Sequence, residues 1–273
     1  MRQYLGNTNF CIGLVLVGIV LAMAVVSIFY TPHDPNAMRI ANRLQPPSPA
    51  HWMGTDEYGR DVLSRVMSGA QTAIIVGLIS VAIGMVFGVL AGAVAGFQGG
   101  WADEVLMRIM DGIYAFPAIL FALMIVAVLG TGMFNTTIAI GLVSIPIFAR
   151  ITRAGFLTVK EKEFVEAARA VGSGPWRIIR THILPNITAP LTVQATVAFA
   201  TAIISEASLS YLGLGTQPPD PSWGRMLKEA QNFLGTAPWT AVFPGVFIAL
   251  AVLGFNLLGD GIRDVLDPRT SKD

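Results

Sequence analysis

The chain has 273 residues, of which 53% are hydrophobic and only 13% carry a charged side chain. Soluble domains have about 25% charged residues, so this composition excludes an ordinary water-soluble protein and predicts that most of the chain lies in a bilayer. The net charge of +1 indicates no nucleic-acid partner, and the single cysteine, Cys11, excludes an intrachain disulfide and a two-cysteine metal site.

Six apolar segments are long enough to predict transmembrane helices, because a spanning helix needs about 20 mostly apolar residues. Runs of this length favour helices over barrel strands, so the expected fold is an all-α membrane protein. The fourth segment is short, and prolines such as Pro117 and Pro146 can bend the helices that contain them. We expect the first segment to be retained, because its apolar run continues past a sequence, Ala22-Met-Ala24, that resembles a signal-peptide cleavage site. The predicted spans are residues 10–30, 72–97, 112–130, 136–149, 189–212 and 241–258.

The lysines and arginines orient these spans. With the N-terminus in the cytoplasm, twelve of the 18 basic residues fall on the inner side and six on the outer side. The positive-inside rule therefore favours both termini in the cytoplasm, and the loop between spans four and five contributes most of the bias. The inner residues are Arg2, Arg108, Arg150, Arg153, Lys160, Lys162, Arg169, Arg177, Arg180, Arg263, Arg269 and Lys272, and the outer ones are Arg39, Arg43, Arg60, Arg65, Arg225 and Lys228.

The second span has a small residue at every fourth position: Ser80, Gly84, Gly88, Gly92 and Gly96. On a helix this spacing forms a stripe along which another backbone approaches closely. The stripe fits tight packing within the chain, and it also fits a contact with a second membrane subunit or a sliding interface. The sequence leaves these alternatives open.

The loop between spans four and five has the pattern of a short helical hairpin. Thr158 and Glu161 stand at the spacing of a capping box, so a helix is expected to start there and run through Val171. Phe164, Ala168 and Val171 would then share one apolar stripe. A charged, helix-prone segment between two apolar runs is expected to project into water.

Residues 172–174 form the expected corner of this hairpin, because glycine permits the left-handed turn that ends a helix. Pro175 suits the first turn of a second helix, expected over residues 176–184 and ended by Pro185. A corner without bulky side chains fits a groove on a partner protein, or else the loop only joins two spans. The expected apolar side of the second helix consists of Trp176, Ile179 and Ile183.

Glu206 is the one acidic residue clearly inside a span, where an ionised carboxylate costs about 2.5–3.5 kcal/mol, so we expect it to face the bundle interior. Two roles fit: contact with a cation or the amino group of a substrate in a translocation path, or a hydrogen bond to a neighbouring hydroxyl or arginine. An intramembrane protease built from Glu206 and Asp111 is also conceivable, although nothing in the sequence places the two carboxylates together.

The first outer loop is charged, and Asp61 and Arg65 stand one helical turn apart, where they are expected to pair. The loop fits a seat for a binding protein or an outer gate, and equally an amphipathic segment lying on the membrane. Trp223 and Trp239 flank a second charged outer segment and are expected to be interfacial anchors of a surface or re-entrant helix. The histidines are far apart in sequence, so no metal triad is expected among His33, His51 and His182.

Motifs for enzymatic phosphate or acyl chemistry are missing from the sequence. It contains no Gly-Lys dipeptide, which a P-loop requires, and no Gly-x-Gly-x-x-Gly, His-Glu-x-x-His or Gly-x-Ser-x-Gly pattern. We therefore expect the chain not to be an enzyme and to contain no cofactor of its own.

Glu166-Ala-Ala-x-x-x-Gly172 followed by Ile183-Leu-Pro185 resembles the signature loop of membrane subunits of binding-protein-dependent ABC importers. His182 replaces the isoleucine that is usual there, as is common in the peptide and nickel branch of that family. Four further motifs resemble the second permease subunit of dipeptide, oligopeptide and nickel importers, so the resemblance covers nearly the whole chain. They span residues 51–65, 107–111 with 116–117, 209–215 and 259–268.

This resemblance implies a type I ABC importer permease fold in a bacterial inner membrane, with residues 1–69 as an N-terminal segment and 70–273 as a five-helix core containing coupling loop 150–188. It implies half of a translocation pathway for di- or oligopeptides, with nickel or glutathione-type substrates as alternatives. The implied partners are a homologous permease, two ATPase subunits that bind ATP and Mg²⁺, a periplasmic solute-binding protein and membrane lipids. The implied ATPase-docking residues are Glu163, Glu166, Ala167, Ala168, Gly172, Ser173 and Gly174. A passive channel or a membrane assembly factor is the alternative from another class.

Overall fold

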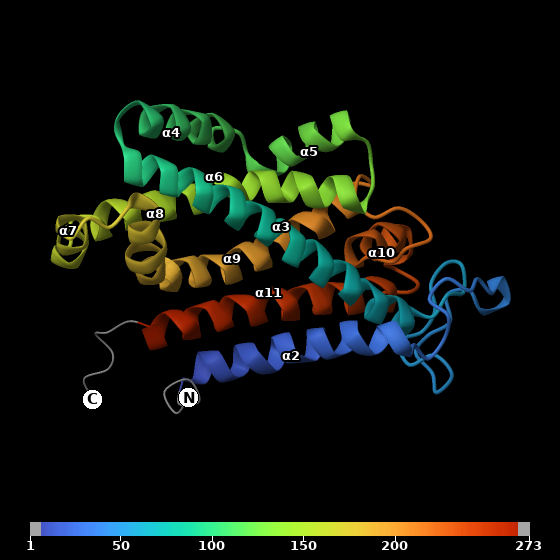
Figure 1. Cartoon of the computed structure of the whole chain (residues 1–273). Helices are drawn as coiled ribbons and strands as arrows, with labels where there is room; N and C mark the ends of the chain where they lie inside the picture. The colour runs from blue at the N-terminus through green and yellow to red at the C-terminus, as the bar shows by residue number, and fades with distance from the viewer. Residues whose placement is uncertain (1–6, 267–273) are drawn as a thin grey trace.

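The computed structural model describes residues 7–266, which form a bundle of helices (Figure 1). Within that range the β pairing is a single isolated bridge between Thr55 and Asp61. The Lys/Arg positions Arg2, Arg269 and Lys272, and the end of the last motif at residues 267–268, lie outside the described residues. The helices are α2 Thr8–Phe29, η1 Ile40–Asn42, α3 Val62–Gln98, α4 Gly100–Tyr114, α5 Ala118–Leu129, α6 Met133–Val159, α7 Glu163–Ala170, α8 Pro175–Ile178, the π-helical turn η2 Ile179–Ile183, α9 Leu184–Tyr211, α10 Trp223–Ala230, η3 Gln231–Phe233 and α11 Trp239–Leu266.

Five helical segments are long and apolar enough to cross a membrane, and a bent pair of helices makes a sixth span. This confirms the all-α membrane fold expected from composition. The N-terminal end of α2 and the C-terminal end of α11 lie at the same end of the bundle as α7 and α8. The loop before α3 and helix α10 lie at the opposite end (Figure 1). A hydrogen bond of 3.1 Å from Asn7 Nδ2 to Asp264 Oδ2 joins the first turn of α2 to the last turns of α11.

The third span differs from the expected straight helix over residues 112–130. It consists of α4 and α5, which meet at an angle of 91°. Pro117 precedes α5, has no backbone N–H, and restricts Phe116 to extended conformations, so the helical ladder breaks there. With 12 residues, α5 is about 18 Å long and does not cross a bilayer core of about 30 Å by itself.

The fourth span is longer than expected, because α6 continues through Pro146 and on to Val159. The apolar run ends at Arg150, but the helix continues because its arginines have partners on α4. Arg150 Nη2 lies 2.7 Å from Asp111 Oδ1, and Arg153 Nη2 lies 2.6 Å from Asp103 Oδ2. The extension also buries Phe156 and Val159 in a core cluster, so ion pairs with α4 and apolar packing both accompany this longer helix.

The small-residue stripe of α3 packs against α6 of the same chain. A Cβ added at Gly88 would lie 2.5 Å from Phe148 Cβ, and one at Gly84 would lie 2.7 Å from Ser144 Cβ. Ser80 Oγ donates a hydrogen bond of 3.0 Å to the carbonyl of Thr137. All five small residues of the stripe are buried. The stripe is therefore used for packing within the chain, which confirms that interpretation.

The division of the chain after residue 69 remains a prediction. It falls inside α3, which begins at Val62 in the outer region and continues without interruption into the membrane. Val20 of α2, Val66 and Ala70 of α3, and Ala251 of α11 belong to one buried core cluster. The N-terminal helix therefore shares its core with the helices that follow.

Candidate functional site

The hairpin between α6 and α9 is fixed to the bundle by one buried face. Val165 and Ala168 of α7 are 0% and 7% exposed and belong to a core cluster with Phe156 of α6 and Ile183 of η2. Lys160, at the end of α6, donates a hydrogen bond of 3.0 Å from Nζ to the carbonyl of Gly96 on α3. The hairpin is therefore a packed element of the fold and not a loosely tethered loop.

The apolar face of α7 is not the one expected from the sequence. Phe164 and Val171 are 44% and 81% exposed, while Val165 takes the buried position. The expected capping box is also wrong. Thr158 still belongs to α6, and its hydroxyl donates to the carbonyl of Ala154 at 3.0 Å, so α7 begins only at Glu163. Of the expected stripe only Ala168 is buried, and it shares the buried face of α7 with Val165.

The corner of the hairpin has the glycine-dependent geometry that the sequence predicts. Gly172 has φ of +80°, its N–H donates to the carbonyl of Arg169 at 2.9 Å, and the N–H of Ser173 donates to the carbonyl of Ala168 at 3.0 Å. These two bonds form a Schellman motif, which ends α7 and satisfies its last carbonyls. Pro175 begins α8, as expected for the first position of a helix.

The second arm of the hairpin continues into the membrane without a break. Residues 175–211 follow one helical path through η2, and Pro185 lies in the first turn of α9 instead of ending a helix. The π-helical turn shifts the hydrogen-bond ladder, which accommodates the missing N–H of the proline. The buried side of this second arm is formed by Ile178 of α8 and Ile183 of η2, whereas Trp176 is 71% exposed. No loop therefore separates α8 from α9.

The structure places most of the predicted docking residues on the exposed side of this hairpin. Glu163, Glu166 and Ala167 are exposed on α7, and Gly172 and Gly174 are exposed at the corner. Ser173 is half-buried, and Ala168 packs inward. Docking on an ATPase subunit remains a prediction, since the structure contains this chain alone.

Glu206 lies on α9 and is 3% exposed. Ser210 Oγ donates a hydrogen bond of 2.6 Å to Glu206 Oε1, and Thr216 Oγ1 donates one of 3.2 Å to the same oxygen. These hydroxyls are the kind of partner expected for a structural role, whereas a role in the translocation path stays a prediction. Asp111, the other carboxylate of the protease hypothesis, pairs with Arg150 instead.

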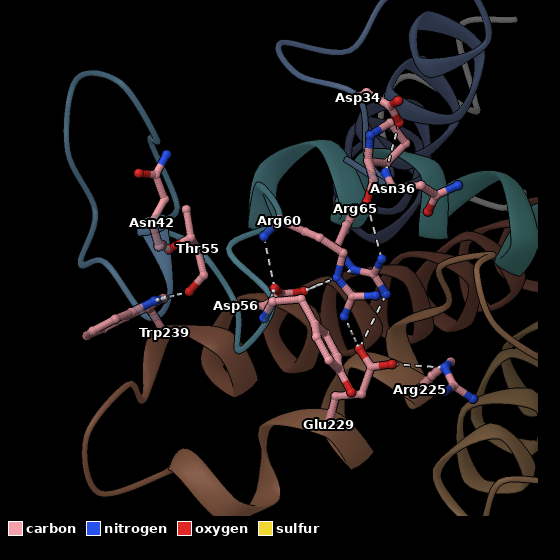
Figure 2. Close-up of polar contacts among 12 residues, drawn as sticks. Asp34, Asn36, Asn42, Thr55, Asp56, Arg60, Arg65, Arg225, Glu229 and Trp239 are labelled. Atoms are coloured by element: carbon pink, nitrogen blue, oxygen red, sulfur yellow. Dashed lines mark hydrogen bonds and ion pairs between the residues drawn. The ribbon is translucent and has the colours of Figure 1, made fainter. Parts of the chain in front are cut away.

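The opposite end of the bundle contains a buried charge cluster that sequence spacing did not reveal (Figure 2). Glu229 of α10 accepts from Arg60 Nη2 at 2.7 Å and from Arg225 Nε at 2.9 Å, and its Oε2 lies 3.3 Å from Arg65 Nη2. Asp56 Oδ2 lies 2.6 Å from Arg60 Nε. The cluster ties the loop before α3 to α10. Spacing along the chain gives no signal for Arg60 with Glu229, because 169 residues separate them.

The expected pairing of Asp61 with Arg65 is wrong. Asp61 is the N-cap of α3, where its Oδ2 accepts from the N–H of Ser64 at 2.8 Å. Arg65 Nη1 instead donates to the carbonyl of Pro35 at 3.2 Å, and the same side chain faces Glu229. A cap requires the carboxylate to turn back toward the helix end, so Asp61 is not available to a residue one turn further on.

Trp223 is buried, so the expectation of an interfacial anchor is wrong for it, whereas for the half-buried Trp239 that role stays a prediction. Trp223 is 1% exposed, and its Nε1 donates to the carbonyl of Val66 at 2.9 Å. Trp239 Nε1 donates to the carbonyl of Thr55 at 3.2 Å (Figure 2). Each indole therefore joins the α10–α11 region to the loop or helix around the start of α3.

Glu57 stands beside the charge cluster on the wall of an open cavity of about 550 Å³. Partial burial raises the pKa of the Glu57 carboxyl above its ordinary value of 4.5, and the nearby carboxylates of Glu229 and Asp56 raise it further. Arg60 and Arg43 act in the opposite direction with smaller effect. The cavity wall also contains Arg43, Arg225 and Lys228, so charged groups of both signs surround this opening.

Comparison with known proteins identifies the family of this chain. The model of the family described as "Binding-protein-dependent transport system inner membrane component" matches residues 84–272. This chain belongs to that family. The matched segment includes the hairpin and all of α9, so the family assignment covers the candidate docking surface.

Relatives of this inner-membrane component match almost all of its length. The dipeptide transport system permease protein DppC of Alkalihalophilus pseudofirmus is 44% identical over 98% of this chain and 88% of its own length. The glutathione transport system permease protein GsiD of Salmonella typhimurium is 48% identical over 94% of this chain and 86% of its own. In fold, the chain resembles a subunit of the MetNI methionine ABC transporter in an inward-facing form, with a TM-score of 0.62 and 18% identity over 74% of this chain and 96% of that one.

Proposed function

We propose that this inner-membrane component forms half of the translocation pathway of an ATP-driven importer for di- or oligopeptides. The observation that carries the proposal is the hairpin, which has an exposed small-residue corner on a buried, continuous support. Rigid support is needed because a flexible loop would absorb a displacement instead of passing it to the spans. The names of the 44% and 48% identical relatives support a short peptide as the substrate class.

In this proposal one of the two ATPase subunits docks on α7 and α8, and the ATP-driven closure of the pair moves the corner. Since α8 continues through η2 into α9, the spans follow as rigid bodies and open the translocation pathway alternately to the two sides. ATP and Mg²⁺ bind to those subunits. A homologous permease completes the pathway, and a solute-binding protein delivers the substrate at the opposite end of the bundle.

The proposed orientation has both termini in the cytoplasm. Helices α2 and α11 begin and end, respectively, at the end of the bundle that contains the hairpin (Figure 1), and the basic residues of the hairpin favour the inner side. Cysteine labelling from outside intact cells, at an added cysteine in residues 163–175, tests this placement. Labelling there would overturn both the orientation and the docking role.

The docking role is tested by Ala167→Trp, which places a large side chain on the exposed side of α7 without entering the core. We expect loss of ATPase co-purification and of peptide uptake. Ala50→Trp, also at an exposed alanine but in the outer loop, is the matched control and should retain the ATPase subunits. Normal co-purification and uptake with Ala167→Trp would reject the coupling assignment.

Glutathione is the second candidate substrate, favoured by the relatives named for its transport. Mass spectrometry of the ligand that co-purifies with the cognate binding protein distinguishes it from a dipeptide.

In a peptide pathway Glu206 would meet the amino group of the substrate, and Glu206→Gln would then raise the KM for uptake. An unchanged KM with lowered protein stability would assign Glu206 to a structural role.

A further inference from the structure

Two histidines and one aspartate of the outer loop converge although they are far apart in sequence. His51 Nδ1 lies 2.9 Å and His33 Nδ1 lies 3.6 Å from the same oxygen, Asp61 Oδ1. One ligating atom from each of the three residues lies within 4.8 Å of the others. Sequence spacing does not predict this triad, because only the folded loop brings His33 next to His51.

The convergence point is open to solvent on one side and has a donor atom without a partner. His33, His51 and Asp61 line a cavity of about 180 Å³ together with Asp34 and Arg39. His33 Nδ1 is buried and has no hydrogen-bond partner, while the two imidazole rings stack with centroids 4.6 Å apart. A buried ring nitrogen 3.6 Å from a carboxylate oxygen, beyond hydrogen-bond distance, is a feature that needs an explanation.

The charge at this point also favours a cation. The Asp61 side chain is 2% exposed, and within residues 7–266 its ion-pair partners are the two histidines and no lysine or arginine. Burial of an ionised carboxylate is costly unless a positive group compensates it. Asp34 and Arg39 on the cavity wall have opposite signs, so Asp61 leaves the cavity with an excess of negative charge.

Asp61 and His33 are held in place by a common support. Ser64 Oγ donates a hydrogen bond of 2.7 Å to Asp61 Oδ2 and accepts one of 3.0 Å from the backbone N–H of His33. The N–H of Ser64 also donates to Asp61 Oδ2, which leaves Oδ1 directed at the histidines. Fixed orientation of a ligating carboxylate by outer hydrogen bonds is typical of metal sites.

The geometry points to a divalent transition-metal site of the Zn²⁺ type, formed by His33 Nδ1, His51 Nδ1 and Asp61 Oδ1 with water in the open position. Tetrahedral zinc has bonds of about 2.0–2.2 Å, which separates its ligand atoms by about 3.3 Å. The distances of 2.9 and 3.6 Å from Asp61 Oδ1 lie on either side of that value, and all three ligand atoms lie within 4.8 Å of one another. Bound metal would connect the segment after α2 to the start of α3.

The test uses the full-length chain, purified in detergent through a tag without histidine and stripped with a chelator. In calorimetric titration with Zn²⁺ we expect one equivalent to bind and the melting temperature to rise, with no response to Mg²⁺, which prefers oxygen ligands. His33→Gln should weaken zinc binding at least about 10-fold. His182→Gln, which changes the remaining histidine of the three in the chain, is the matched control and should bind as the unaltered protein does.

Ser64→Ala provides a second variant, which keeps all three ligands and removes only the shared hydroxyl. It should weaken zinc binding by about 10-fold without abolishing it. Gel filtration without metal checks that each variant is folded; for His33→Gln this is expected because the His33 side chain is 37% exposed. Failure of the unaltered chain to bind zinc, or equal binding by a folded His33→Gln variant, would overturn the proposal and leave a His–Asp hydrogen-bond cluster.

Discussion

Arg60 Nη2 donates a hydrogen bond of 2.7 Å to Glu229 Oε2, which links the loop before α3 to α10 across 169 residues of sequence. The Arg60 side chain is 3% exposed and that of Glu229 is 13% exposed, so water contributes little to their solvation. Arg65 and Arg225 share the same carboxylate (Figure 2). The carboxylates of Glu229 and Asp56 therefore compensate the positive charge of three guanidinium groups.

Glu229→Gln should strongly destabilise the outer region. The substitution keeps the size of the side chain but leaves buried arginines without their main counter-charge, which costs about 3 kcal/mol or more. Thermal unfolding in detergent measures the effect. Glu104→Gln, at an exposed glutamate of α4, should change stability by less than about 0.5 kcal/mol. Equal melting temperatures for the two variants would contradict the importance assigned to the cluster.

Gly88→Ala should destabilise the contact between α3 and α6. The added methyl group would lie 2.5 Å from Phe148 Cβ and 2.7 Å from the carbonyl oxygen of Ile145, so the helices must move apart, at a cost of about 1–3 kcal/mol. Gly18→Ala, in α2, is the control because nothing lies within 4 Å of its added Cβ. Thermal unfolding should show a loss for Gly88→Ala only, and similar stability of both variants would argue against close packing at the stripe.

Gly172→Ala should loosen the hairpin although its Cβ meets no neighbouring atom. The residue has φ of +80°, a conformation that costs an L-residue with a Cβ about 1–2 kcal/mol. Amide hydrogen exchange in α7 should accelerate about 5–30-fold. Gly174→Ala tests the same corner without that strain, since φ at Gly174 is −68°. Unchanged exchange in the Gly172→Ala variant would show that the Schellman turn does not limit the stability of α7.

The raised pKa of Glu57 predicts a specific pH dependence. A carboxyl group whose pKa is higher in the folded state binds more protons when folded, so its contribution to stability falls as the pH rises from its ordinary value of 4.5 through the folded value. Glu57→Gln removes this contribution. The free energy of unfolding of the unaltered chain minus that of this variant should therefore decrease as the pH rises through that window. Denaturation at several pH values measures it. A difference that grows with pH would contradict the assigned environment.

The sequence by itself determined the membrane class, the approximate number and order of the spans, and the hairpin corner. These follow from local physics: a run of apolar residues must be shielded from water, and only glycine adopts φ of +80° at Gly172 without strain. The family resemblance rested on the same contiguous motifs. Pro117 was visible as a potential break, but the angle of 91° between α4 and α5 was not, because packing on α6 decides where a broken span turns.

Only the tertiary structure decided which polar groups meet. The sequence predicts that Thr158 caps α7, but α6 extends past it; it also predicts that Asp61 pairs with Arg65, but Asp61 caps α3 instead. Glu229 with Arg60, and His33 with His51, are brought together by chain segments whose separation in sequence contains no information about contact. Side-chain partners depend on how helix ends and loops fold back, which is a property of the whole chain and not of any local pattern.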